Sequence, residues 1–205
     1  MWVAREAGNP VGLVLHDPRE SVASIFTRSA ELAERLFRQC RESQVYSELD
    51  LKAPRERFRI YAAHITPGEP DHRFRHRIRV AEDRDLAAVK RLLKELYGEL
   101  NERWFSGAIG LEETGFIAEM GGALAGVAFA SVIGAHGRLH SLAVRPGYRG
   151  MGIGLDLLFA RRIWAQRAGA RDLLSEISEH NLPSQKVAER GGMRPVGQIF
   201  LYRRT

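Results

Sequence analysis

Two observations predict an α/β protein of the α+β type. From residue 76 onward, strand-like and helix-like patterns alternate in the order strand, helix, three strands, helix, strand, helix, strand. Near the middle of this run, an apolar strand pattern ends at Val144, and a glycine-rich loop leads into a long helix pattern. The chain has 205 residues, of which 44% are hydrophobic, so it can bury a sizeable core in one large or two small domains.

A smaller α/β unit is predicted for residues 1–72. Residues 2–15 have the pattern of a β-hairpin, and they can be laid without a gap over residues 116–129, at a constant offset of 114. Either the chain contains an internal repeat, or two apolar hairpins agree by chance. The elements expected next are a strand at 21–27, a helix at 29–42, and strands at 44–51 and 58–65. Pro and Gly residues at 66–71 predict a linker, so we place the domain boundary near residue 72.

Residues 73–205 predict a complete unit. Strands are expected at 76–81, at 116–133 as a hairpin, at 138–144, at 172–178 and at 195–203. Helices are expected after Asp83 or Asp85, after the glycine-rich loop, and after Asn181, because apolar residues recur there at helical spacing. Gly169 is a typical end for the second of these helices.

The glycine-rich loop has Arg149 at its start, followed by Gly152 and Gly154 just before the helix. The first turn of a helix has unpaired backbone N–H groups and a partial positive charge, so glycines there let a phosphate approach the backbone. The loop therefore predicts an anion site, although a tight turn between strand and helix is the plainer interpretation. Its spacing fits neither the dinucleotide-binding fingerprint nor the phosphate-binding P-loop.

The same loop resembles the acyl-CoA loop of the GCN5-related N-acetyltransferases (GNAT family), which reads Arg or Gln, two residues, Gly, one residue, Gly or Ala. Leu142-Ala143-Val144 before the loop and Asn181 after the next strand also match this family. The resemblance covers about residues 76–205. It implies a mixed, mostly antiparallel sheet that is flanked by helices and splayed between its fourth and fifth strands. Residues 1–72 would then be a truncated, degenerate GNAT-like unit without a cofactor loop.

The resemblance also implies acetyl-CoA as co-substrate, with no metal. Main-chain groups of Leu142 and Val144 would hold the pantetheine arm, and amides from Arg149 to Leu155 would hold the pyrophosphate. The full set of residues assigned to the cofactor is Leu142, Ala143, Val144, Arg149, Gly150, Met151, Gly152, Ile153, Gly154, Leu155, Asn181 and Ser184.

The reaction implied is direct transfer of acetyl from acetyl-CoA to a primary amine within a ternary complex. A base must first deprotonate the ammonium, and the candidates are His140, Glu176, Glu119 and Glu113, each of which could instead be structural. Ala188 stands where many family members have a tyrosine that protonates the leaving thiolate. A non-catalytic CoA-binding or regulatory module is therefore the alternative.

Charge and composition limit the partners. The net charge is +6, of which +1 lies within residues 1–75 and +5 beyond them, where a polyanionic cofactor would benefit. Because acidic and basic residues are interspersed, the charge argues against a nucleic-acid partner. We find no apolar run long enough for a membrane helix and no secretory signal, so we expect a cytoplasmic protein without membrane contact. A single cysteine, Cys40, excludes an internal disulfide framework. The amine acceptor and a homodimer are left open.

We predict that Gly152→Glu or Gly154→Glu abolishes acetyl-CoA binding without unfolding the chain. A side chain at either position would crowd the phosphates that the loop is expected to hold. Calorimetric titration of the variants with acetyl-CoA measures this, and an unchanged affinity would contradict it.

Overall fold

The computed structural model describes residues 2–6, 9–17, 22–27, 30–40, 44–47, 56–66, 68, 72–98 and 113–203. The chain divides into two compact units. The first comprises Met1–Ile60, Ser178–His180 and Val196–Thr205, and the second comprises Tyr61–Ile177 and Asn181–Pro195. Within the described part of the chain, no helix combines the length and the apolar character needed to cross a membrane.

The first unit begins with the hairpin that the sequence predicts. Its elements are β1 (Trp2–Glu6), β2 (Asn9–Asp17), β3 (Val22–Thr27), α1 (Ala30–Gln39) and β4 (Gln44–Ser47). The strand β5 (Glu56–His64) follows in sequence and has residues in both units. Leu32, Ala33 and Leu36 of α1 are buried, which explains the helical spacing of apolar residues there.

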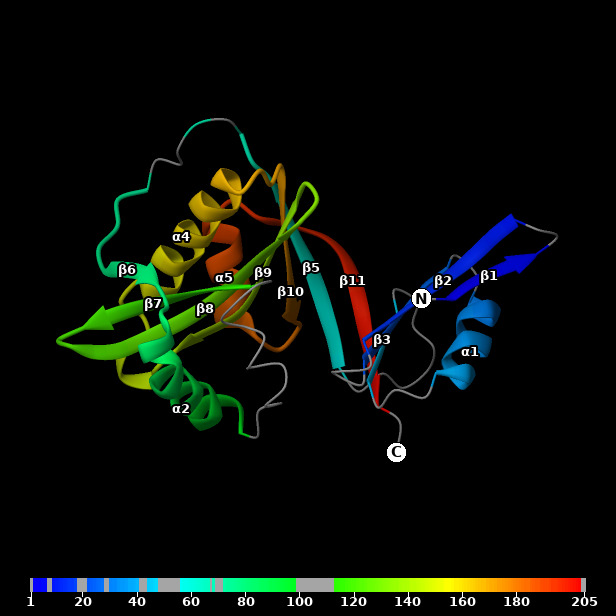
Figure 1. Ribbon diagram of the computed structural model, residues 1–205, viewed down its shortest axis with the longest axis horizontal. Coiled ribbons are helices and arrows are strands. Elements are labelled where there is room, and N and C mark those ends of the chain that lie inside the picture. Colours follow the sequence, from blue (N-terminus) through cyan, green and yellow to red (C-terminus); the bar gives the residue numbers. More distant parts are fainter. Residues whose placement is uncertain are drawn as a thin grey trace. The chain divides into compact units, whose positions relative to one another are not determined.

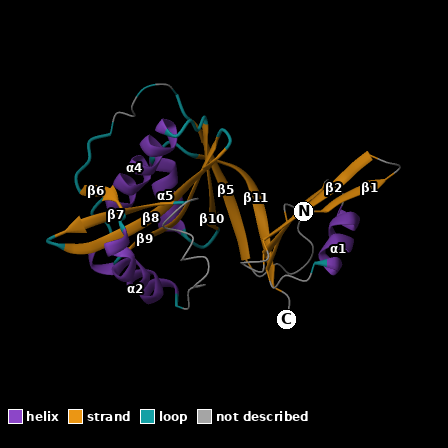
Figure 2. Ribbon diagram, in the orientation of Figure 1, coloured by secondary structure: helices purple, strands orange, loops and turns teal. Residues whose placement is uncertain are grey.

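The second unit has the predicted order of elements (Figures 1 and 2). Its strands and helices, with β11 shared between the units, are β6 (Arg77–Val80), α2 (Leu86–Tyr97), β7 (Thr114–Met120), β8 (Ala123–Ile133), β9 (His136–Val144), α4 (Ile153–Arg167), β10 (Asp172–Ser178), α5 (Leu182–Arg190) and β11 (Arg194–Arg203). Short 3-10 turns at Asp83–Asp85 and Pro146–Tyr148 precede α2 and the glycine-rich loop. The family resemblance also predicts an acceptor-site loop at 101–113 with Trp104 and Phe105 as aromatics, and residues 101–112 of it lie outside the described residues.

Helices cover both faces of the second unit's sheet (Figure 1). Helix α2 packs on one face through a cluster that includes Val89 and Phe129. Helices α4 and α5 pack on the other face through a cluster that includes Leu139, Leu157 and Ala188. Successive side chains along a strand therefore point into different clusters, because they lie on opposite faces of the sheet. Each leucine buried in this way contributes about 1.5–3 kcal/mol to folding.

The sheet of the second unit opens between β9 and β10. Its strand order is β5-β10-β9-β8-β7-β6. The β6–β7, β7–β8 and β8–β9 pairs are antiparallel, whereas β9 and β10 are parallel. The β9–β10 ladder pairs His136 with Asp172 and ends at Arg138 and Leu174, so both strands continue without pairing to each other. The predicted splay between the fourth and fifth strands of this half is thus present.

The two hairpins related by the offset of 114 have the same register. Trp2 pairs with Val14 as Phe116 pairs with Ala128, and the matching continues to the hairpin turns. Both ladders also shift register at the same place, after Ala4 in β1 and after Ala118 in β7. A shared β-bulge is a specific feature of a backbone, because an extra residue changes the twist of the strand locally. This agreement is what an internal repeat predicts.

Beyond the hairpin, the first unit keeps the topology of the second but not its opening. Strand β3 is antiparallel to β2 and parallel to β4, with α1 as the connection, just as α4 connects the parallel strands β9 and β10. The β3–β4 ladder, however, runs along all of β4, from Gln44 to Ser47. Only residues 28 and 29 separate β3 from α1, whereas residues 145–152 separate β9 from α4.

The two compact units differ from the two sequence ranges 1–72 and 73–205, because each unit includes residues from both ranges. The domain boundary near residue 72 stays a prediction. Strand β11 comes last in the sequence, yet it pairs with β4 of the first unit, Phe200 opposite Ser47 and Tyr202 opposite Val45. In the other direction, the end of β5 lies beside β10 in the second unit. The physical reason is backbone pairing: each strand edge is completed by a strand from the other half of the sequence.

A buried carboxylate of α4 binds residues 72–76, the segment that precedes β6. Asp156, in the first turn of α4, is 2% exposed, and its oxygens lie 2.7 Å from His72 Nε2 and 2.6 Å from His76 Nδ1. It also accepts hydrogen bonds from the backbone N–H groups of Arg75 and His76. Burial by itself raises the pKa of Asp156, but these hydrogen bonds together lower it below the ordinary value. The His72 ring stacks on Phe159, with ring centroids 4.0 Å apart.

We predict that Asp156→Asn lowers the free energy of unfolding by about 2–4 kcal/mol, because it removes one partner of a buried, charge-assisted network. The matched control is Asp172→Asn. Asp172 also lies beside two histidines, His64 and His136, but its side chain is 39% exposed, so we expect a loss of at most about 0.5–1 kcal/mol. Urea unfolding of both variants near neutral pH checks this, and equal losses would contradict it.

Candidate active site

A cavity of about 520 Å³ lies in the second unit, bordered by the end of β9, the glycine-rich loop and the start of α5. Its lining includes every residue that the sequence assigned to the cofactor except Met151, which is exposed at the surface. The residues that line it are Leu96, Tyr97, Leu142, Ala143, Val144, Tyr148, Arg149, Gly150, Gly152, Ile153, Gly154, Leu155, Asn181, Pro183, Ser184, Lys186, Val187 and Arg190.

The glycine-rich loop presents backbone N–H groups to this cavity. Gly150 and Gly152 have φ angles of 80° and 96°, a left-handed conformation that a side chain would strain. The amides of Arg149 and Leu155 donate to Pro146 and Gly152 within the chain. Among the described residues, no acceptor is recorded for the amides from Gly150 to Gly154, so these are the groups that an anion could take. At Gly154, an added Cβ would come within 3.3 Å of Val187.

Two side chains occupy the main-chain groups expected to hold a pantetheine arm. Tyr97, at the end of α2, donates its hydroxyl to the carbonyl of Leu142 at 3.0 Å. The Arg149 Nε donates to the carbonyl of Val144 at 3.1 Å. A ligand amide lying along β9 would therefore have to replace these donors. Sequence reasoning missed Tyr97, because nothing in its spacing distinguishes it from other residues of α2.

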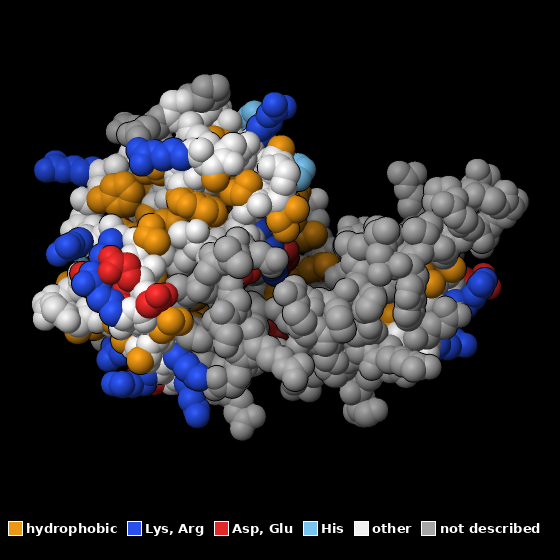
Figure 3. Space-filling model, in the orientation of Figure 1, with side chains coloured by type: hydrophobic (Ala, Val, Ile, Leu, Met, Phe, Trp, Pro, Cys, Tyr) orange, Lys and Arg blue, Asp and Glu red, His pale blue; other side chains and the backbone are white. Residues whose placement is uncertain are grey.

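Helix α5 contributes both a cap and positive charge to the cavity. The Asn181 side chain accepts the backbone N–H of Ser184 at 3.2 Å, so it caps this helix and borders the cavity at the same time. Lys186 and Arg190, which the sequence analysis did not single out, line the cavity beside it. Elsewhere on the visible face, Lys and Arg side chains are scattered rather than gathered in one patch (Figure 3). Basic residues at this rim favour a phosphate-bearing ligand.

A smaller cavity of about 70 Å³ lies next to the first, at the opening between β9 and β10, and the two share Leu142, Ser184 and Val187 in their linings. Its lining also includes His140, Ser141, Arg161, Ser175, Glu176 and Ala188. The β8–β9 ladder shifts register between Val127 and Phe129, opposite this stretch of β9. Ser141 has a φ of 51°, which is unusual for a residue with a side chain and marks a local distortion of the strand.

The structure brings together two of the candidate bases, His140 and Glu113. The His140 Nε2 lies 3.1 Å from the Glu113 carboxylate, and its Nδ1 lies 3.1 Å from the Ser141 hydroxyl. The side chains of His140 and Glu113 are only 10% and 17% exposed. The second Glu113 oxygen is buried with no hydrogen-bond partner among the described residues. A carboxylate in this position can stabilise a protonated imidazole.

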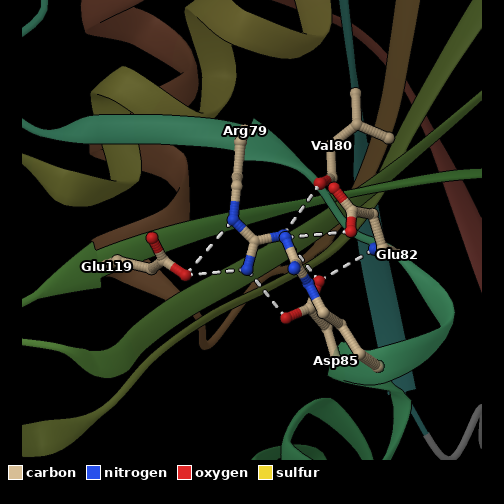
Figure 4. Close-up of polar contacts among 6 residues, drawn as sticks. Arg79, Val80, Glu82, Asp85 and Glu119 are labelled. Atoms are coloured by element: carbon tan, nitrogen blue, oxygen red, sulfur yellow. Dashed lines mark hydrogen bonds and ion pairs between the residues drawn. The ribbon is translucent and has the colours of Figure 1, made fainter.

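Glu176 and Glu119 are not part of this pair. Glu176 borders the smaller cavity, but it is exposed and lies 3.3 Å from Arg138 Nε. Glu119, on β7, lines neither cavity. It is bound by Arg79 of β6, which also binds Asp85 (Figure 4). The hydrogen bond from Arg79 lowers the pKa of Glu119, which makes Glu119 a weaker proton acceptor than we expected.

The position of the missing tyrosine lies in the same region. Ala188 is 2% exposed and lines the smaller cavity. Of the hydroxyl groups that could replace the tyrosine, those of Tyr148 and Ser184 border the larger cavity. The hydroxyl of Tyr202 could also have replaced the tyrosine, but Tyr202 is buried in the first unit and lines neither cavity. Tyr97 adds a phenol that the sequence analysis did not weigh.

The Arg79 network generates a pH-dependent prediction. We expect Arg79→Met to lower the free energy of unfolding by about 1–2 kcal/mol near neutral pH, because two carboxylates lose their donor. The hydrogen bond from Arg79 lowers the pKa of Asp85 to about 2 and also lowers that of Glu119. A carboxyl group whose pKa is lower in the folded state stabilises the fold at pH values above its pKa in the unfolded state. This contribution is lost as the pH falls through the pKa of the folded state.

The difference between wild type and Arg79→Met should therefore be constant above about pH 5 and shrink below about pH 4. Urea unfolding at several pH values measures it. A difference that grows in acid would refute this account of the network.

Comparisons with known proteins agree with this geometry. A family model described as the Acetyltransferase (GNAT) family matches residues 75–193. A GCN5-related N-acetyltransferase from Sphaerobacter thermophilus has a TM-score of 0.66 and 18% identity, covering 96% of this chain and 77% of that one. A tandem GNAT protein from the clavulanic acid biosynthesis pathway has a TM-score of 0.60 and 18% identity, covering 98% and 82%.

A third similar structure is AAC(6')-Iy, solved in complex with a bisubstrate analogue, CoA-S-monomethyl-acetylneamine. It has a TM-score of 0.56 and 24% identity, covering 64% of this chain and 99% of that one. No curated protein matches the sequence. The expected fold is confirmed by these structures, and the family match spans more than half of the sequence. The chain therefore belongs to the GNAT acetyltransferase family.

Proposed function

We propose that the protein transfers the acetyl group of acetyl-CoA directly to a primary amine in a ternary complex. The observation that carries the proposal is the large cavity, which is lined by the end of β9, the glycine-rich loop and the start of α5. The bound co-substrate would supply a thioester as the acetyl donor. AAC(6')-Iy, whose structure is similar, was solved with an analogue that contains CoA, and this likeness supports the choice of donor.

The residues present fit an acyl-CoA. The amides from Gly150 to Gly154 and the dipole of α4 would hold the pyrophosphate, aided by the charges of Arg149, Lys186 and Arg190. The main chain at Leu142 and Val144 would hold the pantetheine arm once Tyr97 and Arg149 release the two carbonyls. Asn181 and Ser184 would lie beside the arm.

His140 and Glu113 would together serve as the base. An ammonium cannot attack a thioester, so its proton must first move to the enzyme. His140 would take that proton, and the Glu113 carboxylate, 3.1 Å from its Nε2, would stabilise the resulting imidazolium. Among the four candidates, this pair is favoured because Glu119 and Glu176 each lie beside an arginine. The leaving thiolate would be protonated by Tyr97, Tyr148, Ser184 or water.

The first unit would be a degenerate copy of the second that binds no cofactor. The shared hairpin register and bulge support the common origin. The continuous β3–β4 ladder and the short connection to α1 support the lack of a site, because no gap and no glycine loop are left for a CoA. Each chain would then hold one acetyl-CoA, in the second unit.

A non-catalytic CoA-binding module is the alternative, and the observation that favours it is Ala188 at the position of the thiolate-protonating tyrosine. Release of free CoA from acetyl-CoA in the presence of a panel of primary amines separates the two. Turnover with any amine supports the transferase, and tight acetyl-CoA binding without turnover supports the module.

We predict that His140→Asn and Glu113→Gln each lower kcat by about 100-fold while changing the Kd of acetyl-CoA by less than about threefold, because they act on proton transfer. Glu119→Gln is the matched control and should change kcat by less than about threefold. Steady-state kinetics and calorimetry measure these values. A large loss of kcat in Glu119→Gln together with normal His140→Asn activity would overturn the assignment.

A further inference from the structure

Arg161 is a buried cation without an acidic partner in the described part of the chain. It lies on α4 and is 3% exposed. Its Nε donates to the carbonyl of Leu157, and its Nη1 donates to the carbonyls of Phe129 and His140. No acceptor among the described residues is recorded for Nη2. Burial lowers the pKa of Arg161 to about 9, which reflects the cost of keeping a charge in this environment.

This guanidinium lines the smaller cavity, which is next to the larger cavity proposed to bind acetyl-CoA. The cavity holds about 70 Å³, which is room for a group of a few non-hydrogen atoms, since one liquid water takes about 30 Å³. Ala188 leaves this space open, because any larger side chain at that position would enter the cavity. Ser141 and Ser175 add hydroxyl groups on the side of the strands, while α4 and α5 contribute the apolar side chains of Leu158, Val187 and Ala188 beside Arg161 and Ser184.

From this arrangement we infer that the smaller cavity is a subsite for a carboxylate at the end of the donor's acyl group. The preferred donor would be an acyl-CoA with a short dicarboxylic acyl chain, whose free carboxylate accepts hydrogen bonds from Arg161 Nη2. The inference rests on the proposed function, because it requires the thioester to lie at the opening between β9 and β10.

Two features favour the acyl donor as the source of the carboxylate. The cavity shares Leu142, Ser184 and Val187 with the larger cavity proposed to bind CoA, so an acyl chain on the thioester would lie next to it. The other charged residue on its border, Glu176, already lies 3.3 Å from Arg138. A carboxylate bound to a buried guanidinium forms a strong, charge-assisted contact that a neutral group of equal shape cannot form.

The test compares malonyl-CoA with acetoacetyl-CoA, which has nearly the same shape but carries a methyl ketone in place of the carboxylate. Calorimetry on the full chain, with acetyl-CoA as reference, should give a Kd for malonyl-CoA at least about tenfold lower than for acetoacetyl-CoA. Arg161→Gln should remove this preference. Arg167→Gln, an exposed position on the same helix, is the control and should keep it.

A second variant covers the case in which Arg161→Gln fails to fold, since Arg161 also supports three carbonyls. Ala188→Leu fills the cavity and leaves Arg161 in place, so it should weaken malonyl-CoA binding relative to acetyl-CoA by at least about tenfold. If acetyl-CoA binds but the wild type does not prefer malonyl-CoA over acetoacetyl-CoA, the carboxylate subsite is wrong while the proposed function still stands. If no CoA thioester binds, the proposed function is overturned with it.

Discussion

The parting of β9 from β10 is the constraint on which the rest of the site depends. Where a ladder ends, the backbone carbonyls of the strand still need donors, and leaving them unpaired would cost folding free energy. Side chains from four elements supply those donors along β9: Ser175 reaches Leu139, Arg161 reaches His140, Tyr97 reaches Leu142, and Arg149 reaches Val144. Side chains of β10, α4, α2 and the loop thus supply donors to carbonyls of β9 at the opening.

Local patterns in the sequence were enough to predict much of this fold. The strand at Asp172–Ser178, the cap at Asn181 and the helix after Gly154 follow from periodicity and from capping residues, which depend on near neighbours. The residues assigned to the cofactor stay a prediction; all but Met151 line one cavity, although they come from the end of β9, the glycine-rich loop and the start of α5. What sequence reasoning missed depends on contacts between distant segments: the Tyr97 hydroxyl on Leu142, the pairing of Glu113 with His140, and the capture of Glu119 by Arg79. No spacing rule reports on such contacts.

The two units share a topology but differ at the features that line the candidate site. Both contain a bulged hairpin, a third strand, a helix and a parallel strand, in the same order. Only the second has a ladder that stops early and a glycine loop before the helix. The two units therefore differ in the interruption of the sheet and in residues 145–152, the features on which the proposed function depends, while the topology is shared.

Strand β5 lies beside β10 and strand β11 pairs with β4, so each has a neighbour from the other half of the sequence. This limits how the chain can be divided. The family match ends at Met193, just before β11, which suggests residues 75–193 as a natural fragment. That fragment would lose β5 and leave one edge of β10 without its neighbour. Extending it to residue 205 would restore β11 but not β4, the strand that β11 pairs with. Unpaired edges of this kind promote association between chains. A fragment of residues 75–205 would therefore leave the β5 side of β10 and the β4 side of β11 unpaired.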